Sequence, residues 1–189
     1  MPSILRNPTN GQILIADHAG DFGSGPATTA NSLIIGTPTD VQMDCTSLSA
    51  GTPPTSGAGR ASAKIDFGSD RPPLFALSAC TEHGTAPSDG SAIEFFMGFS
   101  PNATAGTGNP AGLTGADEAF TWTRGKQGQL MALNALQLEN TEVNIGYIGV
   151  FRPLYRYGML VMVNTSGATL HNVMDEFHIT LTPVEYDES

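Results

Sequence analysis

This 189-residue chain has few basic residues, few cysteines and little aromatic surface, and each shortage excludes a class of protein. Eight Lys and Arg face 18 Asp and Glu, and because the eight are scattered they form no stripe that would bind nucleic acid or an anionic membrane. The two cysteines are too few for a disulfide framework. Cys45 and Cys80 could still pair, but we expect buried free thiols. Aromatic residues make up 7%, with Trp122 the sole tryptophan, so a sugar-stacking platform would depend on tyrosines.

Long apolar runs and catalytic motifs are also lacking. No run approaches the roughly 20 apolar residues of a transmembrane helix. The N-terminus lacks the pattern of a secretory signal, so we expect synthesis in the cytoplasm. The chain contains no GxxxxGK[ST], HExxH, CxxC, EF-hand loop or GxSxG. The glycines from Gly106 to Gly112 have the wrong spacing for a dinucleotide fingerprint, and Pro110 stands where its helix would begin. We expect no cofactor.

The histidines give only weak indications of a metal site. His18 stands between two aspartates that could hold a hard cation, although a turn with local Asp hydrogen bonds explains them equally simply. His171 and Asp175 share one side of a strand, but His178 has the opposite parity, so one zinc ion cannot collect all three. His83 reads as an exposed loop residue. We therefore predict no metal site.

Two carboxylate pairs, Asp117/Glu118 and Glu139/Glu142, are the remaining candidates for catalysis. A glycosidase on a β-sandwich would need two opposed carboxyl groups about 5–10 Å apart in a cleft. The sequence does not provide that distance. Because no other pattern supports an enzyme, we predict a protein without catalytic residues.

What the chain does contain is turn-forming residues and strand-like runs. It has 22 Gly and 13 Pro, only 14% charged residues and 40% hydrophobic residues, which favours an all-β protein with a true core. About eight to ten strands with long Gly/Pro-rich loops predict a single-domain, two-sheet antiparallel sandwich, jelly-roll-like in topology. Residues 1–10 form an extended N-terminal arm, and residues 11–189 form the sandwich. Strands are expected within residues 11–17, 32–36, 39–45, 61–67, 71–81, 92–100, 129–140, 143–151, 155–163 and 176–182, with a turn at 164–167.

Local patterns add detail to this prediction. Alternation over 61–67 is typical of a half-buried strand. A weak capping box at Thr114 suggests a helical turn over 116–120. Segments 129–140 and 143–151 are interpreted as a hairpin, with Val143, Ile145, Tyr147 and Phe151 on one face.

Partner contacts are expected from the arm, from the loops Thr46–Arg60 and Pro101–Gly115, and from an Arg/Tyr cluster around Pro153. Loops longer than about 12–15 residues are uncommon unless functional, and Arg and Tyr are enriched in interfaces. The cluster could equally be a packed strand end with surface arginines, and Trp122 could be a core residue. The candidate contact residues are Ile4, Leu5, Arg6, Pro54, Arg60, Asn102, Asn109, Trp122, Arg152, Tyr155 and Arg156.

The C-terminal half resembles a group of small β-rich virion proteins of tailed bacteriophages. The similarity covers Ala92 to Glu188 and is carried by FFMGFSPNATAGTGNPAGLTGADEAF, IGVFRPLYRYGMLVMVNTSGATL and HITLTPVEYDE, whose shared features are loop glycines and strand apolar residues. The resemblance implies a non-enzymatic head decoration, or cement, protein on the capsid surface. Its partners would be the major capsid protein or another virion protein, and further copies of itself, with a trimer as one candidate.

The alternative is a carbohydrate-binding adhesin or tail-fibre module, because jelly rolls host both roles. Exposed aromatic residues gathered in one groove would favour that alternative.

Overall fold

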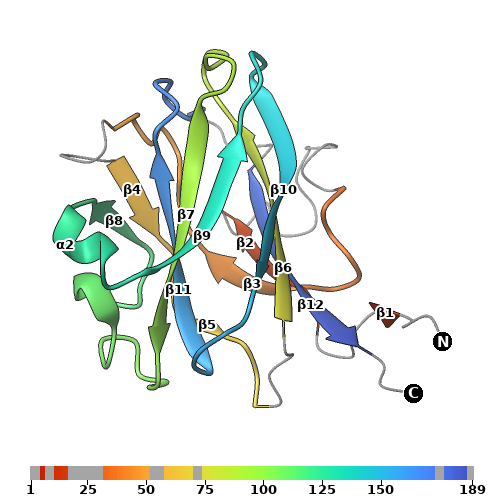
Figure 1. The fold of residues 1–189 in the computed structure, drawn as a ribbon, viewed down its shortest axis with the longest axis vertical. Coiled ribbons are helices and arrows are strands. Elements are labelled where there is room, and N and C mark those ends of the chain that lie inside the picture. The colour runs from red at the N-terminus through yellow and green to blue at the C-terminus, as the bar shows by residue number, and fades with distance from the viewer. Residues whose placement is uncertain are drawn as a thin grey trace.

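The protein is two β-sheets packed face to face, as seen in a computed structural model (Figure 1). The structure describes residues 5–6, 11–16, 32–51, 58–69, 74–172 and 177–186. The first sheet has the order β10 (Val143–Phe151), β6 (Leu74–Glu82), β12 (His178–Tyr186), β2 (Ile13–Ala16) and β3 (Thr39–Gln42), with β1 (Leu5–Arg6) paired to β12. The second has the order β8 (Glu118–Thr121), β4 (Ala58–Ala61), β11 (Tyr157–Asn164), β7 (Ala92–Ser100) and β9 (Met131–Gln137), with β5 (Ile65–Asp66) paired to β11. The predicted all-β sandwich is confirmed.

Eight of these strands have the connectivity of a jelly roll. Counted along the chain, they are β2, β4, β6, β7, β9, β10, β11 and β12. The first sheet then contains the sixth, third, eighth and first strands side by side, and the second contains the second, seventh, fourth and fifth. Among the strand pairings of the described residues, all but that of β2 with β3 are antiparallel.

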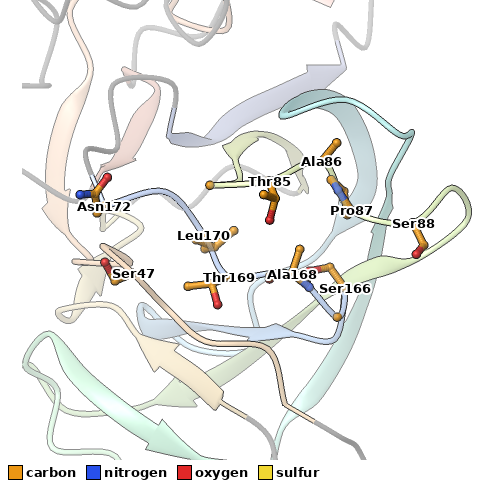
Figure 2. Close-up of a pocket in the computed structure, with 12 residues that line it drawn as sticks. Ser47, Thr85, Ala86, Pro87, Ser88, Ser166, Ala168, Thr169, Leu170 and Asn172 are labelled. Carbon is orange, nitrogen blue, oxygen red and sulfur yellow. Dashed lines mark hydrogen bonds between the residues drawn. The ribbon is translucent and has the colours of Figure 1, made fainter.

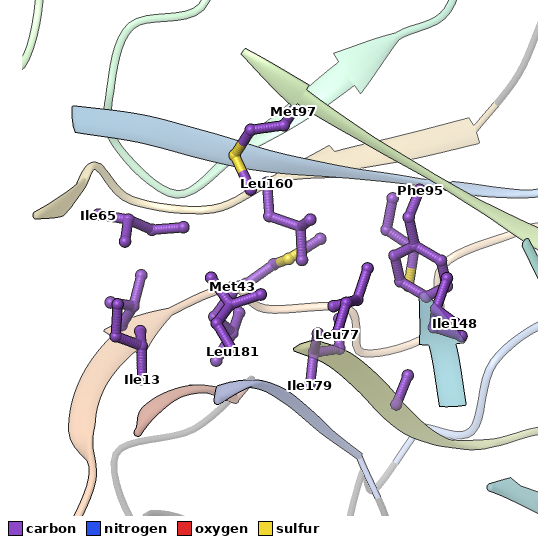
Figure 3. Close-up of a cluster of buried hydrophobic side chains, with 14 of the residues drawn as sticks. Ile13, Met43, Ile65, Leu77, Phe95, Met97, Ile148, Leu160, Ile179 and Leu181 are labelled. Carbon is purple, nitrogen blue, oxygen red and sulfur yellow. The ribbon is translucent and has the colours of Figure 1, made fainter. Parts of the chain in front are cut away.

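The main core lies between the two sheets (Figure 3). β7 contributes every second residue, Ile93, Phe95, Met97 and Phe99, as its alternation predicts, and β12 contributes the buried Ile179 among others. Burying each such side chain stabilises the fold by roughly 1.5–3 kcal/mol. The expected buried thiols are also confirmed, since Cys45 and Cys80 are both buried and are not joined to each other by a disulfide.

A second apolar cluster covers the outer face of the second sheet. The 3-10 turn η1 (Pro110–Gly112), β8 and the short helix α2 (Arg124–Gln127) belong to the segment that forms this cover. Trp122 is 2% exposed, and its ring lies 4.4 Å from that of Phe96 on β7. Phe96 therefore faces away from the main core and is still buried. Trp122 is a core residue and presents no ring to a partner, which corrects its place among the candidate contacts.

Three local predictions are wrong. Residues 118–121 form strand β8 and not a helical turn, because pairing with β4 satisfies their backbone groups and buries Phe120. Segments 129–140 and 143–151 do form strands, but β9 joins the second sheet and β10 the first, so their connection crosses between sheets and is not a hairpin. Residues 32–36 contain a turn and bends, and the strand begins only at Thr39.

A β-bulge explains why the expected face of β10 is also wrong. The pairing with β6 shifts between Tyr147 and Gly149, so one extra residue enters β10. Phe151 consequently points into the core, whereas Ile145 and Tyr147 are 45% and 63% exposed on the opposite face. Alternation alone cannot reveal this change of parity.

The run from Ala61 to Phe67 is two short strands. β4 ends at Ala61 and β5 begins at Ile65, and both pair with β11. Ala61, Ile65 and Phe67 are buried, as the alternation predicts. Between the two strands Ser62 still hydrogen-bonds Leu160 on β11, whereas Lys64 bonds the loop 101–115.

Candidate contact surface

One end of the sandwich gathers two of the predicted contact segments. The loop 101–115 leaves β7 there, and the turn 152–156 enters β11 at the same end (Figure 1). Tyr157, the first residue of β11, pairs with both Ser100 and Asp66, so the loop, the turn and the end of β5 are neighbours. We call this surface the loop end.

Lys64 holds the loop 101–115 in a fixed shape. Its ammonium donates to the backbone carbonyls of Asn102, Thr104 and Thr107 at 3.0, 2.7 and 3.3 Å, and to the Ser100 hydroxyl at 3.2 Å. The backbone N–H of Lys64 also donates to the carbonyl at the far end of the loop, at residue 115. Partial burial lowers the pKa of the Lys64 ammonium.

Asn109 closes the loop from the inside. Its side-chain amide donates to the carbonyls of Ala105 (2.5 Å) and Leu113 (2.9 Å), so this candidate contact residue has a structural role. Gly115 has φ +77°, and a Cβ there would collide with the Ala105 carbonyl. Asn102 is exposed at the loop surface. A loop built this way has little conformational entropy to lose when it binds.

The adjacent turn carries a bidentate ion pair. Arg156 donates from Nε and Nη2 to the two carboxylate oxygens of Asp66, each at 2.8 Å, and its guanidinium lies 5.2 Å from the Tyr157 ring. The hydrogen bond from Arg156 lowers the pKa of Asp66, burial opposes this, and the Gly68 N–H lowers the pKa further. Arg156 is thus exposed but already partnered. Arg152 is exposed, and Tyr155 is 48% exposed.

The other candidate contact residues lie elsewhere. Arg60 is bound to Asp117 (Nε to Oδ1, 2.6 Å) and lies on β4. Leu5 and Arg6 form β1, whose backbone pairs with β12 of the same chain, and their side chains lie outside the described residues. Ile4 and Pro54 also lie outside the described residues. The division into an arm and a sandwich stays a prediction.

A polar pocket occupies the opposite end of the sandwich (Figure 2). It has a volume of about 520 Å³ and lies between the turn after β6 and the turn after β11. Its described lining is mainly small residues and hydroxyls, without charged or aromatic side chains. The lining residues are Ser47, Gly84, Thr85, Ala86, Pro87, Ser88, Ser166, Gly167, Ala168, Thr169, Leu170 and Asn172. Such a lining can hydrogen-bond a small polar molecule, but it offers no acid or base.

His83 is buried near this pocket, so its prediction as an exposed loop residue is wrong. Its exposed fraction is 0%, and a β-bridge to Leu170 draws it under the turn. Neither ring nitrogen makes a hydrogen bond to a residue in the described part of the chain. Burial lowers the pKa of His83, and the nearby Glu142 backbone only partly opposes this.

Of the two candidate carboxylate pairs, Asp117 and Glu118 serve structural roles. Asp117 accepts hydrogen bonds from Arg60 and from the Asp44 N–H, and Glu118 accepts one from the Thr114 N–H. Glu139 and Glu142 are exposed in the connection from β9 to β10.

His18 and Asp175 lie outside the described residues. Among those described, no group of three or more His, Cys, Asp or Glu side chains is placed to hold a metal ion. Nor does the described part contain a helix long and apolar enough to cross a membrane.

In comparisons with known proteins, no family model, curated protein or solved structure matches the chain.

Proposed function

We propose that this protein is a non-enzymatic structural component of a tailed-phage particle, a decoration protein that binds and stabilises the capsid lattice. The proposal starts from the sequence resemblance of residues 92–188 to small virion proteins. In this role the protein covers the surface of the major capsid protein, with many weak contacts summed over repeated copies.

The observation that carries the proposal is the loop end. The loop 101–115 is held by Lys64 and Asn109, and the neighbouring turn is held by the Arg156–Asp66 pair. A long exposed loop and a short exposed turn are therefore pre-organised side by side. That arrangement suits contact with a protein surface better than turnover of a small molecule.

The ionisable groups agree with this role. The described arginine and aspartate side chains with shifted pKa values, Arg60, Asp66 and Arg156, are paired within the chain. The described pocket contains no charged lining residue. An active site usually brings groups with shifted pKa values together in a cleft, and these groups do not meet in one.

The test is binding of the purified protein to undecorated capsids, measured by co-sedimentation. We expect saturable binding at a fixed number of copies per capsid. A truncated protein lacking Met1–Asn10 should remain folded and lose binding, because the arm is expected to supply contacts to neighbours. Equal binding by the truncated protein would refute the role of the arm, and no binding by the full chain would refute the proposal.

The second candidate is a carbohydrate-binding module, which the polar pocket favours. Its hydroxyl-rich lining and volume of about 520 Å³ suit one or two sugar units. Its lining lacks the aromatic ring on which sugars commonly stack. A glycan array decides between the two: specific glycan binding that is lost on filling the pocket, for example with Ala168→Trp, would establish this alternative.

A further inference from the structure

The outer face of β10 concentrates the exposed apolar surface of the molecule. Of the six large hydrophobic side chains that are exposed in the described part, five lie on β10 and the turn after it: Ile145, Tyr147, Val150, Leu154 and Tyr155. At their exposed fractions they present roughly 500 Å² to solvent, against about 800 Å² per partner in a standard protein interface, of which somewhat more than half is apolar. The area therefore matches what one side of a specific interface needs.

The charges around this surface are ordered along the strand. Although the chain has 18 acidic residues, none lies between Val143 and Met174. Exposed Glu139 and Glu142 immediately precede the strand, and exposed Arg152 follows it without an ion pair to any described residue. The surface is acidic at one end, apolar in the middle and basic at the other.

The edge of β10 is less available than its face. β10 is the terminal strand of its sheet (Figure 1), but two of its carbonyls accept side-chain hydrogen bonds. The Asn134 amide donates to Ile148 O (3.0 Å), and the Thr141 hydroxyl donates to Val143 O (2.8 Å). An added strand would have to displace these donors, so a partner is better placed against the outer face.

Two copies of this surface related by a two-fold axis have complementary charges, because the acidic end of one lies opposite the basic end of the other. Tyr147, the most exposed of the five, is midway in sequence between Glu142 and Arg152. A two-fold axis beside Tyr147 would run two β10 strands antiparallel and bring Arg152 of one copy to Glu142 of the other. A net charge of −10 opposes association of two copies elsewhere, whereas a contact centred on apolar β10 residues, with each Glu142 opposite an Arg152, reduces that repulsion.

We infer that a second copy of this chain packs against the outer face of β10, forming a two-fold dimer about Tyr147. The dimer goes beyond capsid binding and does not rest on it, because it centres on β10 and requires no phage component. It shares only the turn 152–156 with the loop end. The trimer considered from the sequence would need a different contact, because a two-fold axis relates two copies and not three.

The test is the mass of the full chain in solution, by sedimentation equilibrium from 1 to 100 μM. We expect the wild type to dimerise within this range, and Tyr147→Asp to raise the dimer dissociation constant at least about 100-fold. The control pair is Ile145→Asp and Ile35→Asp, because both isoleucines are 45% exposed and only Ile145 lies on β10. Ile145→Asp should weaken the dimer, and Ile35→Asp should leave it unchanged.

A charge exchange tests the orientation. Arg152→Glu and Glu142→Arg should each weaken the dimer about tenfold, and the double variant should recover to within about threefold of the wild type. A monomeric wild type at 100 μM, or a Tyr147→Asp variant that still dimerises, overturns the dimer. A double variant no better than the single ones overturns the two-fold arrangement. Circular dichroism checks that each variant is folded, which we expect because all substituted side chains are exposed.

Discussion

Replacing Lys64 by methionine should loosen the loop 101–115 and leave the sandwich intact. Methionine keeps much of the apolar stem but removes the ammonium that binds three carbonyls and one hydroxyl. A hydrogen bond to a charged group contributes about 1.5–3 kcal/mol when its partner cannot turn to water. These carbonyls are at the surface and can be hydrated, so we expect only about 1.5–2 kcal/mol in total for opening the loop.

Amide hydrogen exchange measures this local opening. An opening free energy lower by about 1.5–2 kcal/mol speeds exchange about 10- to 30-fold at amides protected only by the loop. Thr104 and Thr107 are the reporters, since their N–H groups donate within the loop to Asn102 Oδ1 and Thr104 O. Amides of the central strand β6 should be unaffected.

Lys126→Met is the matched control. It removes the same charge from the chain's other lysine, which lies over the Phe120 ring and away from the loop. Equal exchange at Thr104 and Thr107 in both variants would refute the structural role of Lys64. If the capsid-binding proposal holds, Lys64→Met should also weaken binding and Lys126→Met should not.

Three further predictions test other parts of the structure. Gly115→Ala should destabilise the loop, because its φ is +77° and the new Cβ would meet the Ala105 carbonyl; limited proteolysis should then cut within 101–115. Trp122→Ala should lower the free energy of unfolding by about 3–5 kcal/mol in urea melts, and a loss below 1 kcal/mol would mean that the second cluster is not packed. Because burial lowers the pKa of His83 in the folded state, the unfolded chain binds its proton first, so stability should fall as the pH drops below about 6.5. His83→Leu should remove that part of the pH dependence, and an unchanged pH profile would contradict it.

The sequence alone was enough to predict the buried residues of strands that have one face against the main core. β7 and the inward residues of β12 follow their period-two patterns because each has a face against the opposite sheet. The period-two pattern did not predict that Phe96 is buried beneath Trp122. The second apolar cluster covers the outer face of the second sheet, so both faces of β7 are apolar. The same holds for β9 and β10: a short connection suggests a hairpin, but long-range pairing assigns the two strands to different sheets.

The contact surface was only partly predictable. Length and composition identified the loop 101–115, whereas the role of Lys64 depends on a break between β4 and β5 that alternation does not mark. The sequence pattern placed Phe151 on the same face of β10 as Ile145 and Tyr147, because alternation does not reveal the bulge that reverses the parity within the strand. Arg60 and Trp122 belong to residue types common in interfaces, but both also serve the chain's own packing, since Arg60 pairs with Asp117 and Trp122 is buried in the second cluster.

Immunogold electron microscopy of purified phage particles containing this chain tests the central claim most directly. The account predicts gold over the head surface of every particle, at a density consistent with many copies per capsid. Gold confined to the tail, or particles that carry no label while the protein remains in the lysate, would contradict it.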